Sequence, residues 1–159
     1  MRKQVFVAIG VVAILVASAA QVSAVTMQLP IHSVTPGATN PSVTQANIGS
    51  TICVVGYTKT IRPPASYTTG LKRAQLRGSY AFYGSTNTKL FEEDHLIPLE
   101  VGGAPRSAAN LWPEPWASAR MKDQLENKMH LLVCAHQITL AAAQKVFVSN
   151  WVTAFNKYV

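Results

Sequence analysis

Acidic residues are scarce in this chain: only 7 of its 159 residues are Asp or Glu, against 14 Lys and Arg. Such an excess of positive charge favours polyanionic partners such as nucleic acid or an anionic surface, although many exported proteins are basic for no specific reason. The chain also lacks an internal repeat, which excludes solenoid and array architectures. Charge and composition therefore bound the class of partner but do not choose one.

Cysteine is scarcer still, because the chain has only Cys53 and Cys134. Two cysteines exclude a disulfide-dense scaffold and leave one disulfide, a reactive thiol or a metal-bound pair. No set of ligand-type residues stands near either cysteine in the sequence, and an even count in an exported chain favours a disulfide. A crosslink over about 80 residues contributes about 4 kcal/mol by chain-entropy reasoning.

Long hydrophobic runs are absent except at the start of the chain. Met1-Arg2-Lys3 is followed by an almost wholly apolar run over residues 5–16 and by small residues ending at Ala24. The run is short for a membrane-spanning helix and no basic cluster follows it, which favours a signal peptide cleaved after Ala24 over a retained anchor. We therefore expect a secreted or periplasmic protein with no stable membrane insertion. Loss of Arg2 and Lys3 reduces the 14 basic residues to 12, a net charge of +5.

The mature part, residues 25–159, is long enough for one domain with its own core. Residues 25–39 are rich in Thr, Pro, Ser and Gly and are predicted to be a flexible lead-in to a domain over 40–159. Periodicity, capping residues and breakers predict an α+β fold. The expected helices are about 40–48, 66–77, 117–133 and about 140–156, the last capped by Thr139, and the expected strands are 52–62, 88–94 and 110–112.

Three of the seven acidic residues are consecutive, in the stretch FEEDHLIPLEVGG at residues 91–103. Carboxylates are the ligands of hard cations, and histidine is a natural base near neutral pH. Asp94 can therefore hold a metal while His95 activates a water. Asn110, on the neighbouring strand, can fix the imidazole, and Asp123, on the following helix, can complete the metal site.

These residues carry a resemblance to a known family. The pattern D-H, then P-L-x-x-G-G, then N-L fifteen residues after the histidine, then a helix, resembles the ββα-metal motif of HNH endonucleases over residues 89–131. The flanking patterns T-I-C-x-x-G-Y-T-x-x-I-R-P-P, N-L-W-P-E-P and K-D-x-L-E are similar to those of small exported bacterial proteins with an HNH-like domain.

The resemblance implies a ββα-metal core with additional flanking helices and a hydrolase, an endonuclease that cleaves phosphodiester bonds in DNA or RNA with little sequence preference. It implies that His95 deprotonates a water that Asn110 orients, while Asp94 and Asp123 hold Mg²⁺ or Mn²⁺, with Zn²⁺ less suited to a carboxylate set. The chain departs from the pattern at Ala119, where many HNH enzymes place a metal-binding His or Asn.

Several residues have a second, plainer interpretation. Asp123 can be a solvated helix residue, with Glu126 as the reserve ligand and Glu93 as a reserve ligand or a supporting group. Arg106, Arg120 and Lys122 can contact phosphates or be ordinary surface charges. Trp112 and Trp116 can stack on bases or pack in the core. The whole chain can also be a non-catalytic exported binding module on an HNH-like scaffold, which the residue at Ala119 suggests.

Overall fold

The protein has a mixed helical and stranded fold. The computed structural model describes residues 26–159, so the predicted signal peptide lies outside the described residues. The predicted α+β class is confirmed. In chain order, the elements are η1 (Gln45–Ser50), α1 (Tyr57–Ile61), α2 (Ala65–Arg77), η2 (Ala81–Tyr83), η3 (Thr88–Leu90), β1 (Phe91–His95), η4 (Leu99–Val101), η5 (Ala108–Asn110), β2 (Leu111–Pro115), α3 (Trp116–Cys134) and α4 (Leu140–Tyr158).

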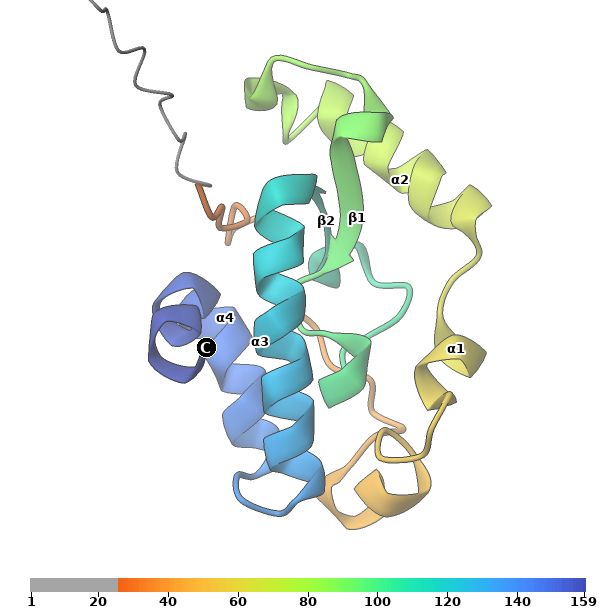
Figure 1. The fold of residues 1–159 in the computed structure, drawn as a ribbon. Coiled ribbons are helices and arrows are strands. Elements are labelled where there is room, and N and C mark those ends of the chain that lie inside the picture. The colour runs from red at the N-terminus through yellow and green to blue at the C-terminus, as the bar shows by residue number, and fades with distance from the viewer. Residues whose placement is uncertain (1–25) are drawn as a thin grey trace, which may run out of the picture.

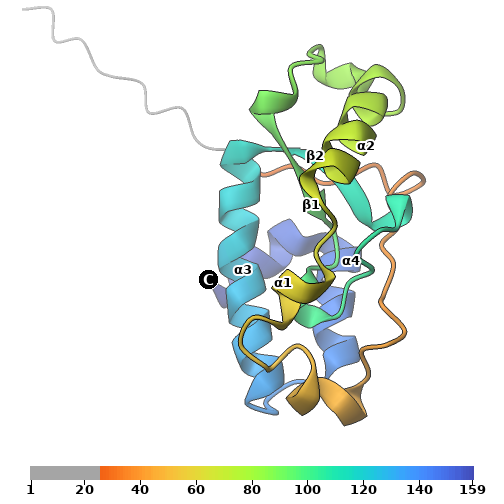
Figure 2. The same cartoon turned by 90° about the vertical axis from the view of Figure 1, so that its right-hand side faces the viewer.

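The two strands form an antiparallel hairpin in the middle of the molecule. Asp94 pairs with Trp112, and His95 pairs with Leu111. The hairpin lies between α2 and α3, which contact both strands (Figure 1, Figure 2). The strand expected over residues 110–112 is longer than predicted, because β2 includes Pro113 and Pro115. In a two-stranded sheet both strands are edges, where proline is tolerated.

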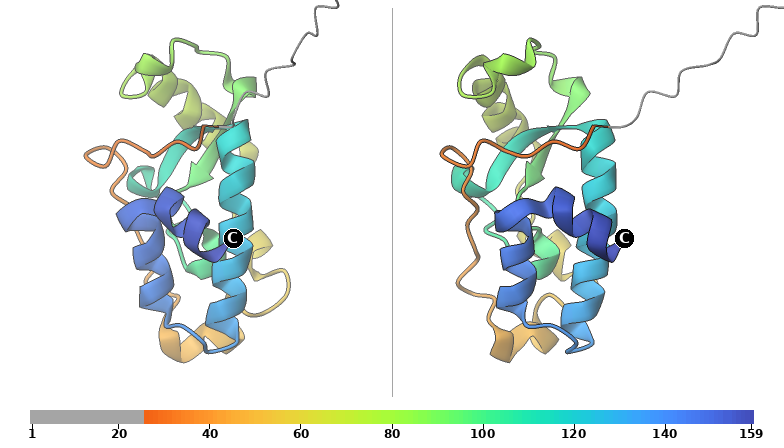
Figure 3. Two further views of the ribbon diagram at one scale, coloured as in Figure 1. Left: turned by 60° about the vertical axis from the view of Figure 1, so that its left-hand side comes forward. Right: turned by 90° about the vertical axis from the view of Figure 1, so that its left-hand side faces the viewer.

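The long helices α3 and α4 pack against each other, as Figure 3 shows, and both contribute side chains to the hydrophobic core. The predicted apolar stripe of α3 is buried at Leu125, Met129 and Val133. As predicted, Thr139 caps α4, its side chain accepting a hydrogen bond from the amide of Ala142. The extended backbone of Asn150 interrupts α4 and bends it. None of the helices in residues 26–159 has the length and apolar character needed to span a bilayer.

The N-terminal segment, residues 26–40, is docked on the domain, and the prediction of a flexible lead-in is wrong for it. Thr39 forms an antiparallel bridge with Gly103, and the amide of Ala104 donates to the carbonyl of Ala38 at 2.8 Å. The buried hydroxyl of Thr35 lies 2.8 Å from that of Tyr80. We call residues 26–40 the strap, because its backbone pairs with the loop after β1.

Two further predictions of local structure are corrected. The expected strand over 52–62 is a series of turns followed by α1, because the described residues offer this β-branched run no strand to pair with. The turn before α1 ends at Gly56, whose φ of 85° suits glycine. The expected helix over 40–48 is a later and tighter one, η1.

Candidate functional site

Asp94 and His95 are the last two residues of β1. The carboxylate of Asp94 faces α3, where its Oδ2 atom lies 2.7 Å from Nζ of Lys122. His95 lines a cleft beside β1, together with Arg62 and Lys72. Both side chains are almost completely buried. The two residues of the predicted centre therefore have different surroundings.

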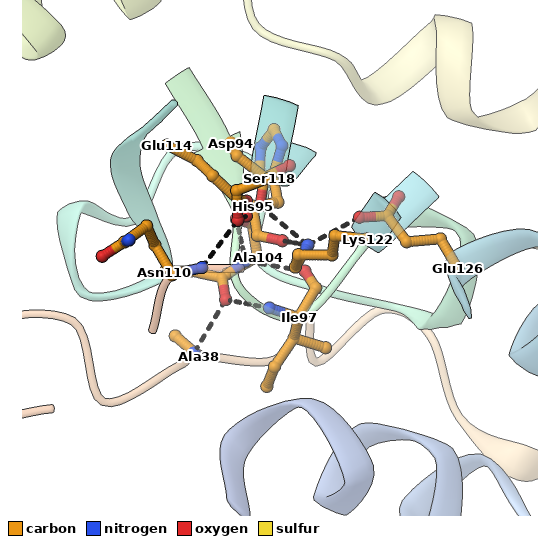
Figure 4. Close-up of polar contacts among 11 residues, drawn as sticks. Ala38, Asp94, His95, Ile97, Ala104, Asn110, Glu114, Ser118, Lys122 and Glu126 are labelled. Carbon is orange, nitrogen blue, oxygen red and sulfur yellow. Dashed lines mark hydrogen bonds and ion pairs between the residues drawn. The ribbon is translucent and has the colours of Figure 1, made fainter. Parts of the chain in front are cut away.

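The ammonium group of Lys122 stands at the centre of a cluster of oxygens (Figure 4). It lies 2.7 Å from Oδ2 of Asp94 and 2.6 Å from Oε1 of Glu126, and it donates to the carbonyl of His95 at 2.7 Å. Lys122 hydrogen-bonds the oxygens of His95 and Glu126, and it forms an ion pair with Asp94. We call this arrangement the lysine cage.

Lys122 was predicted either to contact phosphate or to be an ordinary surface charge, and its complete burial corrects both interpretations. Its exposure is 0 %, and its ammonium is fully committed to the lysine cage. The signal was present in the sequence: Lys122 lies three, seven and eleven residues before Leu125, Met129 and Val133, on the buried stripe of α3. A lysine in that phase needs buried partners, and Asp94 and Glu126 supply them.

Glu114 adds a third carboxylate to this buried region. Its Oε1 atom accepts a 2.5 Å hydrogen bond from Ser118, while Oε2 has no hydrogen-bond partner among residues 26–159. Burial, and then the charge of Asp94, raise the pKa of Glu114 well above its ordinary value. Glu114 therefore takes up a proton more readily than an exposed glutamate does, and it is not among the site residues predicted from the sequence.

Lys122 and the carboxylates around it shift one another's pKa values. Burial alone would lower the pKa of Lys122, but the carboxylates of Asp94, Glu126 and Glu114 outweigh burial and raise it. Lys122 is therefore charged at all ordinary pH values. Burial raises the pKa of Glu126 although Lys122 opposes the change.

The cleft beside β1 has a volume of about 290 Å³ and holds most of the remaining candidate residues. Its walls come from the segment before α2, from α2 itself, from β1 and from the start of α3. The residues that line it are Arg62, Pro63, Ala65, Thr68, Lys72, Glu92, Glu93, His95 and Trp116. We call this space the cleft.

His95 is held in one orientation in the cleft. Its Nε2 atom lies 3.0 Å from the carbonyl oxygen of Pro105. A carbonyl oxygen only accepts, so Nε2 carries the proton of the neutral ring and Nδ1 keeps its lone pair. Burial lowers the pKa of His95, and the bond to Pro105 and the charge of Asp94 offset only part of that effect. The neutral imidazole expected at pH 7 is the form that can accept a proton.

Asn110 supports the site in a different way from the one predicted. It is completely buried, and its amide binds backbone only (Figure 4). Its Oδ1 atom accepts from the amides of Ile97 at 2.9 Å and Ala38 at 3.3 Å, and its Nδ2 atom donates to the carbonyls of Ile97 at 3.0 Å and Ala104 at 3.2 Å. Asn110 thus joins three backbone segments behind His95 and does not bond the imidazole.

Glu92 and Glu93 place two carboxyl groups in the cleft, together with Lys72. Burial, and then the charges of Asp94 and Asp123, raise the pKa of Glu92 to about 7. Burial raises the pKa of Glu93 to about 8, and Lys72 opposes this change. Neither carboxylate oxygen of Glu93 has a hydrogen-bond partner within residues 26–159. Both groups are therefore partly or mostly protonated at neutral pH.

The remaining predicted residues lie around the cleft or away from it. Asp123 lies on the solvent-facing side of α3, but neighbouring groups partly desolvate its carboxylate, and this desolvation and then the charge of Asp94 raise its pKa. The guanidinium of Arg106 lies 5.8 Å from the centre of the Tyr67 ring. Arg120 is exposed on α3. Arg62, whose charge acts on Glu92, His95 and Asp123, is a better-placed cation than either of these arginines.

The resemblance implies a divalent cation, and these residues suit it only as a site with few protein ligands and open coordination positions. No three carboxylate or histidine ligands around Asp94 lie within 4.8 Å of one another in the part of the chain that the structure describes. A closed Zn²⁺ site with four protein ligands is therefore not formed. Mg²⁺ is commonly held by one or two carboxylates, with waters and substrate phosphates as the other ligands. Asp94, with Asp123 or Glu92 beside it, suits that kind of site.

The predicted disulfide between Cys53 and Cys134 is confirmed, with the two Cα atoms 5.6 Å apart. His130 lies beside it, and ligand atoms of the three residues are within 4.8 Å of one another. This Cys–His–Cys cluster could hold a metal ion if the disulfide were reduced, because only thiolate sulfur is a good ligand. His130 is one helical turn before Cys134, and this spacing was the signal in the sequence for a third ligand-type residue beside the cysteines.

Comparison of the chain with protein-family models, with curated proteins and with solved structures gave no match. A function for this protein is therefore inferred from the geometry of the cleft and of the lysine cage.

Proposed function

We propose that the protein is an exported, metal-dependent nuclease with its active centre in the cleft. The observation that carries this proposal is the state of His95: a buried, neutral imidazole at the end of a strand, with Nε2 fixed by Pro105 and Nδ1 left to accept a proton. The resemblance of the Asp94–Asn110 stretch to HNH endonucleases supports the same assignment.

Each residue near the cleft has a role in this proposal. His95 takes a proton from a water at Nδ1, and the backbone bonds of Asn110 keep the loop behind it rigid. Arg62 and Lys72 attract the phosphate. Asp94, with Asp123 or Glu92, would hold Mg²⁺ or Mn²⁺, which supplies charge stabilisation to the phosphate and the leaving oxygen. The substrate is DNA or RNA.

Export is part of the proposal. Disulfides persist in oxidising compartments, and the Cys53–Cys134 bridge suits a periplasmic or extracellular protein. The sequence of residues 1–24 has the pattern of a signal peptide.

A cleavage assay tests the proposal. The oxidised protein is incubated with supercoiled plasmid or single-stranded RNA and with Mg²⁺, Mn²⁺, Zn²⁺ or EDTA. We expect metal-dependent cleavage that falls by about 10²–10⁴-fold in His95→Ala, the usual contribution of a general base. The control is His32→Ala, which removes an exposed histidine outside the cleft. Cleavage that survives in His95→Ala would show that His95 is not the general base.

A second function, a non-catalytic binding module, is favoured by the lysine cage. The ammonium of Lys122 already neutralises Asp94, the predicted metal ligand, and Ala119 offers no ligand. Failure of a folded, oxidised protein to cleave DNA or RNA with any of the three metals would select this alternative.

A further inference from the structure

Trp116, the first residue of α3, differs from the other tryptophans of the chain. The chain has three tryptophans; Trp112 and Trp151 are completely buried, whereas Trp116 is 41 % exposed. Its indole Nε1 donates to the carbonyl of Lys89 at 2.9 Å, which fixes the ring in place. The ring therefore presents a rigid aromatic surface to solvent, and this surface forms part of the cleft.

Cations line the same space. Arg62 is exposed, and its guanidinium forms no ion pair or hydrogen bond within residues 26–159. The ammonium of Lys72 donates to the carbonyl of Phe91 at 2.7 Å, which holds this charge beside β1. An aromatic ring next to a free guanidinium and a fixed ammonium is the combination that binds single-stranded nucleic acid, through base stacking and phosphate contacts.

The cleft also has a direction. Trp116 directly follows Pro115, which pairs with Phe91 at one end of β1, and His95 is at the other end. Four residue steps of a strand cover about 13 Å at ~3.3 Å per residue. A short single strand can therefore contact Trp116 and reach His95. A continuous duplex does not offer the face of an internal base, because its bases are stacked on one another.

We propose that Trp116 stacks on a base of a single-stranded nucleic acid whose backbone follows Arg62 and Lys72 towards His95. This inference rests on the proposed function for its connection to catalysis, but the binding itself does not require cleavage. It narrows the substrate class to single strands or unpaired regions.

Tryptophan fluorescence is a selective test, because Trp116 is the tryptophan that solvent reaches. The full-length oxidised protein is titrated in EDTA with oligothymidylate, with an abasic strand of the same length, and with the matching duplex. We expect oligothymidylate to quench the tryptophan fluorescence and to reduce further quenching by iodide, because the bound base covers the Trp116 ring. We expect it to bind on the order of tenfold more tightly than the abasic strand, as base–aromatic stacking implies.

Three variants identify the ring responsible. Trp116→Leu should lose the preference for oligothymidylate over the abasic strand, while Trp116→Phe should keep part of it because a ring remains. Phe82→Leu, which removes an aromatic side chain that is 63 % exposed but does not line the cleft, should behave as the wild type. Circular dichroism checks that each variant is folded.

The outcomes separate this inference from the proposed nuclease activity. Equal affinity for the oligothymidylate and the abasic strand, tighter binding of the duplex, or an unchanged preference in Trp116→Leu would overturn the stacking inference even if the protein cleaves. Quenching and base preference without cleavage under any metal would support stacking and reject the nuclease.

Discussion

Replacement of Lys122 by methionine is the sharpest test of the lysine cage. Methionine has a similar length but no charge, so the substitution leaves the apolar stem of the side chain and removes three N–H donors. Asp94, Glu126 and the carbonyl of His95 would each lose a contact of 2.6–2.7 Å. The three oxygen atoms would remain around a position that is fully shielded from solvent, because the Lys122 side chain has no exposed surface.

The cost follows from the burial. Removing one partner of a buried ion pair destabilises a protein by about 3–5 kcal/mol, because the other charge is left uncompensated. A domain of this size has a free energy of unfolding of about 5–15 kcal/mol, so the loss is a large fraction of the total. The loss should be smaller at pH 5 than at pH 8, because the abandoned carboxylates can take up protons at the lower pH.

Urea unfolding of the oxidised protein at pH 5 and pH 8 measures this effect. Lys128→Met is the matched control, since Lys128 is an exposed lysine on the same helix and its loss should cost less than about 0.5 kcal/mol. Glu126→Gln in the Lys122→Met background should cost less than in the wild type, which a double-mutant cycle reports. A loss below about 1 kcal/mol for Lys122→Met, or an equal loss at both pH values, would refute the cage as described.

Four further changes test other parts of the structure. Asn110→Ala leaves buried backbone groups without partners and should cost about 3 kcal/mol, measured by urea unfolding, at about 1–3 kcal/mol for each unsatisfied group. Gly103→Ala would place a Cβ 1.7 Å from a backbone oxygen and should prevent stable folding, whereas Gly70→Ala meets no atom within 4 Å and should be neutral or stabilising in thermal melts. Because the pKa of Glu93 is raised to about 8, the folded chain keeps a proton that the unfolded chain releases from about pH 4.5 upward; stability should therefore fall between pH 4.5 and 8, and Glu93→Gln should flatten that slope in urea midpoints taken in EDTA. Cys53→Ser should lower the free energy of unfolding by about 4.5 kcal/mol by the chain-entropy relation, and reduction of the wild type should match it.

The elements with strong local signals could be predicted from the sequence. The apolar period of α3 and the Thr139 cap of α4 each act within a few residues, so both helices were expected close to where they lie. The order of two strands and a helix followed from the same kind of signal.

The errors came from interactions between distant residues. The strap contains the Thr, Pro, Ser and Gly residues of a loose segment, but its backbone pairs with residues more than 60 positions away. The site shows the same limit: Asp94 was correctly placed at the end of a strand, but its ion pair with Lys122 depends on how α3 is rotated about its axis. Composition does not contain that information, although the buried phase of Lys122 on α3 does.

The strap also determines how far this domain can be reduced or transplanted. The hairpin and α3 carry all the charged groups of the lysine cage, so a designer might move only residues 91–134 to a new scaffold. That fragment would lack Ala38, whose backbone hydrogen-bonds Asn110 and Ala104. It would also lack Gln28, whose backbone amide donates to the hydroxyl of Ser118 at 2.8 Å. The smallest transferable unit therefore includes Gln28, and a natural recombination event that separated the strap from the hairpin would keep Asp94, His95 and Asn110 but lose the contacts that position them.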